Sequence, residues 1–286
     1  MNTENEVALE LPATVQSGSG AIIQLVKREG KKYLKKSLTQ NTRALVPLLK
    51  ELNVRTHCYL LQDTFPWMQA RKNIPTSQER IRNSEEKYIA WSHAGIPTPE
   101  KRIVNDLEYY IPFIENTVSV DAYVEATPDP AVIQKTMVAL NNTREQAFKH
   151  NDVSYLHTDP NLGNFLYDKS SHVVIPIDAE FATTDKPLDT LDTLLLSQAV
   201  FYIAALQTPD TYVKEYAAIF RQAVGKQKAK EVAAQTNFSI SPVAHAYLSS
   251  KKALQKVLDR NPDSFVETVQ GVKHRYDTYI KDILLS

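Results

Sequence analysis

The sequence predicts a mixed α and β protein in which strands gather near the N-terminus and helices fill the second half. Three short strand-type segments, at about 7–15, 21–29 and 32–38, are separated by the glycine-bearing turns SGSG and EGK. From residue 119 onward, most segments instead carry apolar residues at helical spacing. A pair of strand-type segments near residue 170 interrupts these helices, and the prediction of function rests on that pair.

Composition restricts the class of protein. The 286 residues include 33 basic and 33 acidic side chains and 43% hydrophobic residues, enough for one large or two small domains. This balance indicates neither a nucleic-acid nor a membrane-surface partner. The single cysteine, Cys58, excludes an intrachain disulfide framework and favours a reducing, cytoplasmic compartment. The polar N-terminus is not a signal peptide, the apolar run Leu194–Leu206 indicates a buried helix, and unclustered histidines make zinc unexpected.

The stretch His157–Glu180 carries the predicted chemistry. It predicts a polar loop, a strand, a turn at 168–171 and a second strand rich in β-branched residues. Such a hairpin folds Asp178 back beside Asn164, with Asp159 facing the same space. An amide oxygen and a carboxylate suit a magnesium ion that also binds phosphates, and a nearby carboxylate can accept the proton of an attacking hydroxyl. These are the parts that phosphoryl transfer needs.

The spacing H-x-D-x-x-x-x-N followed by I-D-x-E resembles the catalytic core of the protein-kinase-like superfamily. It is closest to the branch containing aminoglycoside phosphotransferases, choline kinases and lipopolysaccharide-core sugar kinases. The resemblance implies a two-lobed α+β fold that binds ATP and Mg²⁺ between a sheet lobe, 1–115, and a helical lobe, 116–286. The implied site comprises Asp159 as catalytic base, His157 as the residue that shapes the loop, and the magnesium ligands Asn164, Asp178 and Glu180.

The N-terminal segments resemble the nucleotide-binding half of the same family. Gly18 and Gly20 stand in a turn whose backbone N–H groups can approach phosphates. The segment YLK resembles the family's lysine motif, so Lys35 is expected to bind the nucleotide phosphates, with Lys36 as the alternative. Tyr33 lies on the same strand face as Lys35 and is expected to stack on adenine.

The segment SEEKYIAWSHAGIPTPE resembles the family's E…GIPxP pattern. It predicts a helix that stops at Gly95, with Tyr88 and Ile89 on its inward face. Glu85 is the expected ion-pair partner of Lys35, with Glu86 as the alternative.

The segment IPFIEN corresponds to the family's hinge, where the backbone meets the edge of adenine. Because Pro112 has no N–H, the expected donors are Phe113 and Ile114.

Residues 38–80 depart from the compact family pattern and predict an inserted segment. It contains a hydrophobic anchor at Phe65, Pro66 and Trp67 and an excess of basic residues, among them Arg71. This composition fits a lid or a docking surface for an anionic substrate, but a lobe elaboration with a solvated basic face is the favoured interpretation.

Few residues separate Glu180 from the next helix, whereas protein kinases have a longer activation segment there. This favours a small-molecule or saccharide acceptor. Asp189 or Asp192 is expected to cap that helix and brace the catalytic loop. The sequence therefore predicts ATP- and Mg²⁺-dependent phosphorylation of a hydroxyl. A protein kinase and a nucleotide-binding pseudoenzyme acting as a scaffold remain the alternatives.

Overall fold

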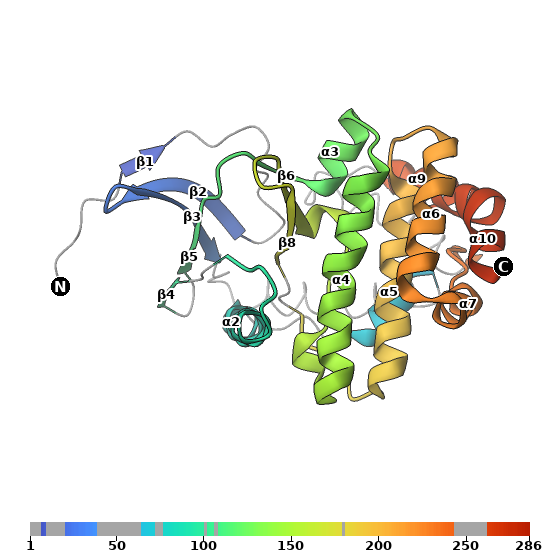
Figure 1. Ribbon diagram of the computed structural model, residues 1–286, viewed down its shortest axis with the longest axis horizontal. Coiled ribbons are helices and arrows are strands. Elements are labelled where there is room, and N and C mark those ends of the chain that lie inside the picture. The colour runs from blue at the N-terminus through green and yellow to red at the C-terminus, as the bar shows by residue number, and fades with distance from the viewer. Residues whose placement is uncertain are drawn as a thin grey trace.

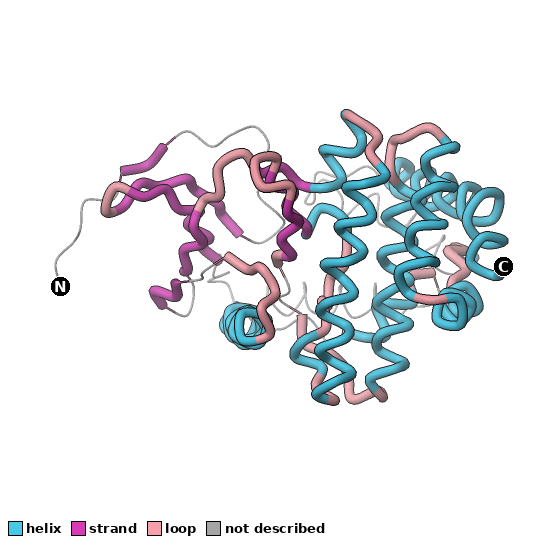
Figure 2. Tube along the Cα trace, in the orientation of Figure 1, coloured by secondary structure: helices cyan, strands magenta, loops and turns pink. Residues whose placement is uncertain are grey.

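The structure is a computed structural model that has an α+β architecture. It describes residues 7–9, 21–38, 64–71, 77–99, 102–105, 108–178, 181–242 and 262–286. A small antiparallel sheet and helix α2 (Ser77–His93) lie at one end, and a group of helices forms the other end (Figure 1). Figure 2 shows the same division between strands and helices. The predicted order, strands first and helices after, is confirmed.

The N-terminal sheet has five antiparallel strands in the spatial order β1-β2-β3-β5-β4. Its strands are β1 (Val7–Leu9), β2 (Ala21–Arg28), β3 (Lys31–Leu38), β4 (Arg102–Asn105) and β5 (Glu108–Pro112). The turn between β2 and β3 places Glu29 and Gly30 at positive φ, 50° and 78°, as a tight hairpin turn requires. Strand β3 lies at the centre, where Lys36 pairs with Tyr109 of β5.

Helix α2 packs against this sheet through Ile81, which contacts Tyr109. Its buried positions 81, 84, 87, 88 and 91 recur at helical spacing and form one stripe. The prediction that Ile89 faces inward is wrong, because this side chain is 51% exposed. One residue step turns a helix by about 100°, which carries Ile89 away from the stripe that contains Tyr88.

A second antiparallel sheet, in the order β6-β7-β8, contains the predicted hairpin. Its strands are β6 (Thr117–Ser119), β7 (Phe165–Asp168) and β8 (Val173–Pro176). Phe165 pairs with Pro176, and the Asp168 carboxylate accepts the N–H of Ser170 at 2.8 Å and the hydroxyl of Ser171 at 2.7 Å. The hairpin and its turn are therefore confirmed.

The remaining elements are helical. They are η1 (Pro66–Ala70), α3 (Val120–Ala126), α4 (Pro130–His150), η2 (Val153–Tyr155), η3 (Leu162–Asn164), α5 (Leu188–Ala205), α6 (Asp210–Val224), α7 (Lys226–Gln235), α9 (Pro262–Arg275), the π-helical turn η6 (Tyr276–Ile280) and α10 (Lys281–Leu285). Among the described helices, α5 alone is long and apolar enough to cross a bilayer, but 72% of it is buried inside the protein. A core helix has the same properties.

The expected hydrophobic anchor fastens η1 to the helical end. Phe65 and Trp67 are buried, and their rings lie 5.4 and 5.3 Å from that of Phe201 on α5. The Phe238 ring lies 5.3 Å from that of Phe201 and 6.3 Å from that of Trp67. Part of the predicted insertion therefore packs on the helices rather than on the N-terminal sheet.

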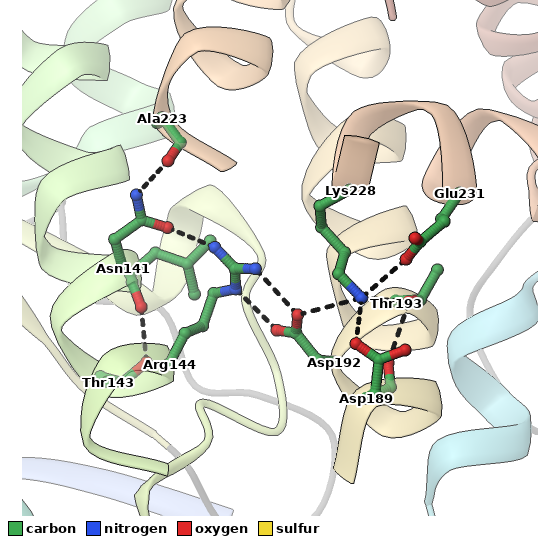
Figure 3. A network of polar contacts seen from close by, with 10 residues as sticks. Asn141, Thr143, Arg144, Asp189, Asp192, Thr193, Ala223, Lys228 and Glu231 are labelled. Atoms are coloured by element: carbon green, nitrogen blue, oxygen red, sulfur yellow. Dashed lines mark hydrogen bonds and ion pairs between the residues drawn. The ribbon is translucent and has the colours of Figure 1, made fainter. Parts of the chain in front are cut away.

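The start of α5 differs from the prediction. Its N-cap is Pro187, so neither Asp189 nor Asp192 caps it. Asp192 instead accepts two hydrogen bonds from Arg144 of α4, at 2.6 and 2.8 Å, and Lys228 of α7 lies beside both acids (Figure 3). Because Asp192 is four residues into the helix, its carboxylate points sideways toward α4 and α7, and the network joins three helices.

Candidate active site

The hairpin brings Asp159, Asn164 and Asp178 to one place. The Ile177 N–H donates to the Asn164 carbonyl at 2.8 Å, which continues the strand pairing one step past Phe165. The Asn164 side-chain amide donates to the Asp159 carbonyl at 3.0 Å. Asn164 therefore connects the loop that carries Asp159 with the strand end that carries Asp178, as the sequence predicts.

Asp178 occupies an unusual backbone conformation. Its φ of 60° lies in the left-handed region, where a non-glycine residue costs about 1 kcal/mol or more. Its N–H donates to the Tyr88 hydroxyl at 3.0 Å, and its carboxylate accepts from the Lys36 amine at 2.8 Å. Helix α2 therefore holds the backbone of Asp178 and strand β3 holds its carboxylate, just beyond the end of β8.

Of the two lysines considered for the nucleotide phosphates, the alternative, Lys36, is the one that contacts Asp178. Lys36 makes that contact, whereas the Lys35 amine lies 3.8 Å from Glu108 and 5.8 Å from the centre of the Tyr110 ring. Tyr33, on the Lys35 face, makes an edge contact with Tyr110 at 6.0 Å. Because side chains alternate along a strand, Lys35 and Tyr33 both point away from Asp178.

The ion pair expected between Glu85 and Lys35 is not formed. Within the part of the chain that the structure describes, Glu85 pairs with neither Lys35 nor Lys36. Tyr88, almost one helical turn further along α2, reaches Asp178 instead. The inward stripe of α2 thus meets the site through a phenol hydroxyl.

Helix α2 also holds the chain that leads into the loop carrying Asp159. The Lys87 amine donates to the Leu156 carbonyl at 3.0 Å, and the Trp91 indole donates to the Tyr155 carbonyl at 2.7 Å. Burial lowers the pKa of Lys87 to about 8, although Asp152 opposes the shift. These contacts dock α2 onto the helical end beside the loop.

His157 contacts the backbone of the loop that carries Asp159. Its ring is buried between Trp91 and Phe165, at 5.4 and 4.9 Å between ring centres. Its Nδ1 accepts the Asp159 N–H at 3.3 Å. Burial lowers its pKa to about 4, although Asp159 opposes the shift, so the ring is neutral at pH 7 and shapes the loop.

Two residues that sequence reasoning missed contact the Asp159 carboxylate. Its Oδ1 accepts from Arg71 Nη2 at 2.7 Å and from Gln198 Nε2 at 2.5 Å. Arg71 Nε also donates to the Thr158 carbonyl at 3.1 Å. The expectation of a solvated basic face is wrong for Arg71, which is only 17% exposed. Two features of the sequence could have indicated these contacts: the polar Gln198 inside the apolar α5, and Arg71 soon after the aromatic anchor.

The remaining predicted site residues have three different outcomes. Phe113 donates its N–H to the Lys32 carbonyl at 3.0 Å, which occupies the donor expected for adenine. The Ile114 N–H donates to no residue in the described ranges. Gly18, Gly20 and Glu180 lie outside the described residues.

The donor set at the hairpin fits magnesium. Among the described residues, no group of three His, Cys, Asp or Glu side chains forms a metal cluster. Magnesium, however, commonly takes one or two carboxylates and completes its shell with waters and phosphates. Asn164 uses its amide nitrogen on the Asp159 carbonyl, which leaves the amide oxygen as the ligand atom, and Asp178 keeps 42% of its side chain exposed.

Comparison with known protein families and curated proteins identifies no relative of the chain. No protein-family model matches the chain, and no curated protein matches it.

Proposed function

We propose that this protein is a phosphotransferase that uses ATP and Mg²⁺ to phosphorylate a hydroxyl of a small molecule or saccharide. The proposal rests on one observation above all: Asn164 joins Asp159 to the strand end that carries Asp178, and Lys36 faces Asp178. A base, a metal-ligand pair and a cation for phosphate then surround one space.

The residues divide the reaction among them. Asp159 would accept the proton of the acceptor hydroxyl as its oxygen bonds to the γ-phosphorus of ATP. The bond from that phosphorus to the β–γ bridging oxygen breaks, ADP leaves, and the proton passes from Asp159 to solvent. Lys36 would bind the nucleotide phosphates in place of Lys35. Asn164 and Asp178 would hold magnesium, which offsets phosphate charge when bound.

A two-lobed kinase-like fold is part of the proposal. The small sheet, the hairpin and the helical end support it, and the boundary expected near 115 falls between β5 and β6. Nucleotide would lie between β3 and the β7-β8 hairpin, with the Ile114 N–H as the donor to adenine. The Tyr33 face of β3 is the wrong face for stacking on that adenine.

The segment after the hairpin favours a small acceptor over a protein. Only residues 181–187 precede α5 in the described chain after Asp178, and part of this length is fastened to η1. The Thr184 N–H donates to the Ala70 carbonyl at 2.9 Å, and Arg71 forms a β-bridge with Thr183. A segment held in this way presents little free backbone to an extended peptide.

The test is acceptor-dependent ADP release with Mg-ATP in the wild-type protein, Asp159→Asn and Asp178→Asn. The matched control is Asp282→Asn, an exposed acid on the C-terminal α10. We expect at least a 1,000-fold loss of turnover in both site variants and none in the control, by analogy with removal of a catalytic proton acceptor. Full activity in Asp178→Asn would refute the metal assignment. ATP binding without turnover by any acceptor would favour the scaffold alternative.

A further inference from the structure

Packing fixes Arg71 beside Asp159. Its backbone bridges to Thr183, and the centre of its guanidinium lies 4.3 Å from the centre of the Phe181 ring. The buried Phe65 and Trp67 hold the start of η1 on α5. The backbone of Arg71 is therefore fixed on both sides, and its guanidinium has a defined position against the loop that carries Asp159.

The hydrogen bonds of Arg71 leave one side of its guanidinium open. Arginine has five N–H donors. Nε donates to the Thr158 carbonyl, and the two N–H groups of Nη2 serve Asp159 at 2.7 Å and Gln198 Oε1 at 2.6 Å. Nη1 donates to no residue within the described ranges. It is also not one of the fully buried polar atoms that lack a hydrogen-bond partner there. Nη1 thus keeps two N–H donors that are not fully shielded from solvent, on the guanidinium that contacts Asp159.

The charge on Arg71 also needs a partner during the reaction. Before transfer, the Asp159 carboxylate balances the guanidinium across 2.7 Å. When Asp159 takes the acceptor proton, that negative charge disappears and leaves a largely buried cation without its counter-ion, which is costly. An anionic group on the acceptor, bound at Nη1, would supply the missing charge at that moment.

We infer that Arg71 is an acceptor-binding residue that selects hydroxyl compounds carrying an oxyanion, either a carboxylate or a phosphate, near the hydroxyl. The inference rests on the proposed function and specifies its substrate class. Arginine suits this role because its planar N–H groups match carboxylate and phosphate oxygens. A cationic acceptor, such as an aminoglycoside or choline, would be repelled by the same guanidinium.

The test compares acceptors that differ in charge. ADP release with Mg-ATP is measured for glucuronate, glucose 6-phosphate, glucose and glucosamine, in the wild-type protein and in Arg71→Gln. Arg82→Gln, which removes an exposed arginine of α2, is the matched control. We expect the wild type to prefer an anionic sugar over glucose in kcat/KM, and Arg71→Gln to reduce this preference by about 10- to 100-fold. The ratio between acceptors cancels any general effect of Arg71 on Asp159.

The two anionic sugars distinguish a carboxylate acceptor from a phosphate acceptor. A preference for glucose or glucosamine, or an anionic preference that survives in Arg71→Gln, would overturn the inference while leaving the kinase proposal intact.

If none of these sugars is turned over, calorimetric titration of glucuronate and glucose 6-phosphate in the presence of Mg-ADP decides. Tighter binding to the wild type than to Arg71→Gln supports the inference, whereas equal or undetectable binding refutes it. A separate titration with Mg-ATP tests the proposed function, because failure to bind nucleotide would exclude a kinase whatever the sugars do.

Discussion

The ion pairs of the candidate site differ from those of the helical network in their access to solvent. At the site, the Asp178 side chain is 42% exposed and Asp159 is 19% exposed. In the network of Figure 3, Asp192 is 2% exposed and faces both Arg144 and Lys228. The Lys36–Asp178 pair, whose carboxylate is the more exposed, can exchange its partner for a phosphate or a metal at a lower cost than the buried Arg144–Asp192 pair can. The first arrangement suits function and the second suits stability.

The largest effect that would test this comparison is at the buried pair. Arg144→Met leaves Asp192 without its bidentate partner, so we expect a loss of about 3–5 kcal/mol in the free energy of unfolding. Denaturant unfolding measures it. Arg144→Met with Asp192→Leu should recover much of this loss, because an apolar pair leaves no unpaired charge. A loss below 1 kcal/mol would mean that the network does not stabilise the helical end.

The next largest effect is a loss of folding stability at acidic pH that is caused by the buried His157. The pKa of this ring is about 4 in the folded protein and near 6.5 in the unfolded chain. The unfolded chain therefore binds more protons between these values, and stability falls as the pH drops through this window, by about 3 kcal/mol in total. His157→Asn keeps an acceptor for the Asp159 N–H but does not titrate, so its unfolding free energy should fall less from pH 7 to pH 4. Parallel curves for the two proteins would contradict the shift.

Replacing the two neighbouring lysines of β3 one at a time tests the ion pair between Lys36 and Asp178, in which the carboxylate is partly exposed. Lys36→Met should reduce kcat/KM for ATP by about 100-fold, equal to about 2.7 kcal/mol, while its unfolding free energy changes by under about 1 kcal/mol. Lys35→Met is the matched control on the opposite strand face, and its kcat/KM should stay within a few-fold of the wild type. The reverse order of effects would restore Lys35 as the phosphate-binding residue.

The smallest effect is expected at Gln198. Gln198→Leu removes one of the two donors to Asp159 but retains Arg71, so we expect about a 10-fold loss in kcat. The control is Gln207→Leu, which changes an exposed glutamine beyond the end of α5. Steady-state kinetics with any active acceptor measures both. A loss as large as that of Asp159→Asn would give Gln198 a larger role than positioning the carboxylate.

The sequence by itself determined the hairpin and the loop before it. Turn residues, β-branched strands and the spacing from His157 to Asp178 are local, so the pairing of Phe165 with Pro176 follows from neighbours in the chain. The order of elements and the anchor at Phe65 and Trp67 could be predicted from hydrophobic pattern for the same reason.

Tertiary structure alone decided which side chains meet the acids. Alternation along β3 separates Lys35 from Lys36 but does not say which face turns toward the hairpin, and the helical stripe of α2 brought Tyr88 rather than Glu85 to Asp178. Arg71 lies 88 residues from Asp159 in the chain, and no local pattern encodes a contact across that separation. Long-range packing of η1 and α2 against the helical end sets these contacts, because the position of each backbone segment determines which groups its side chains can reach.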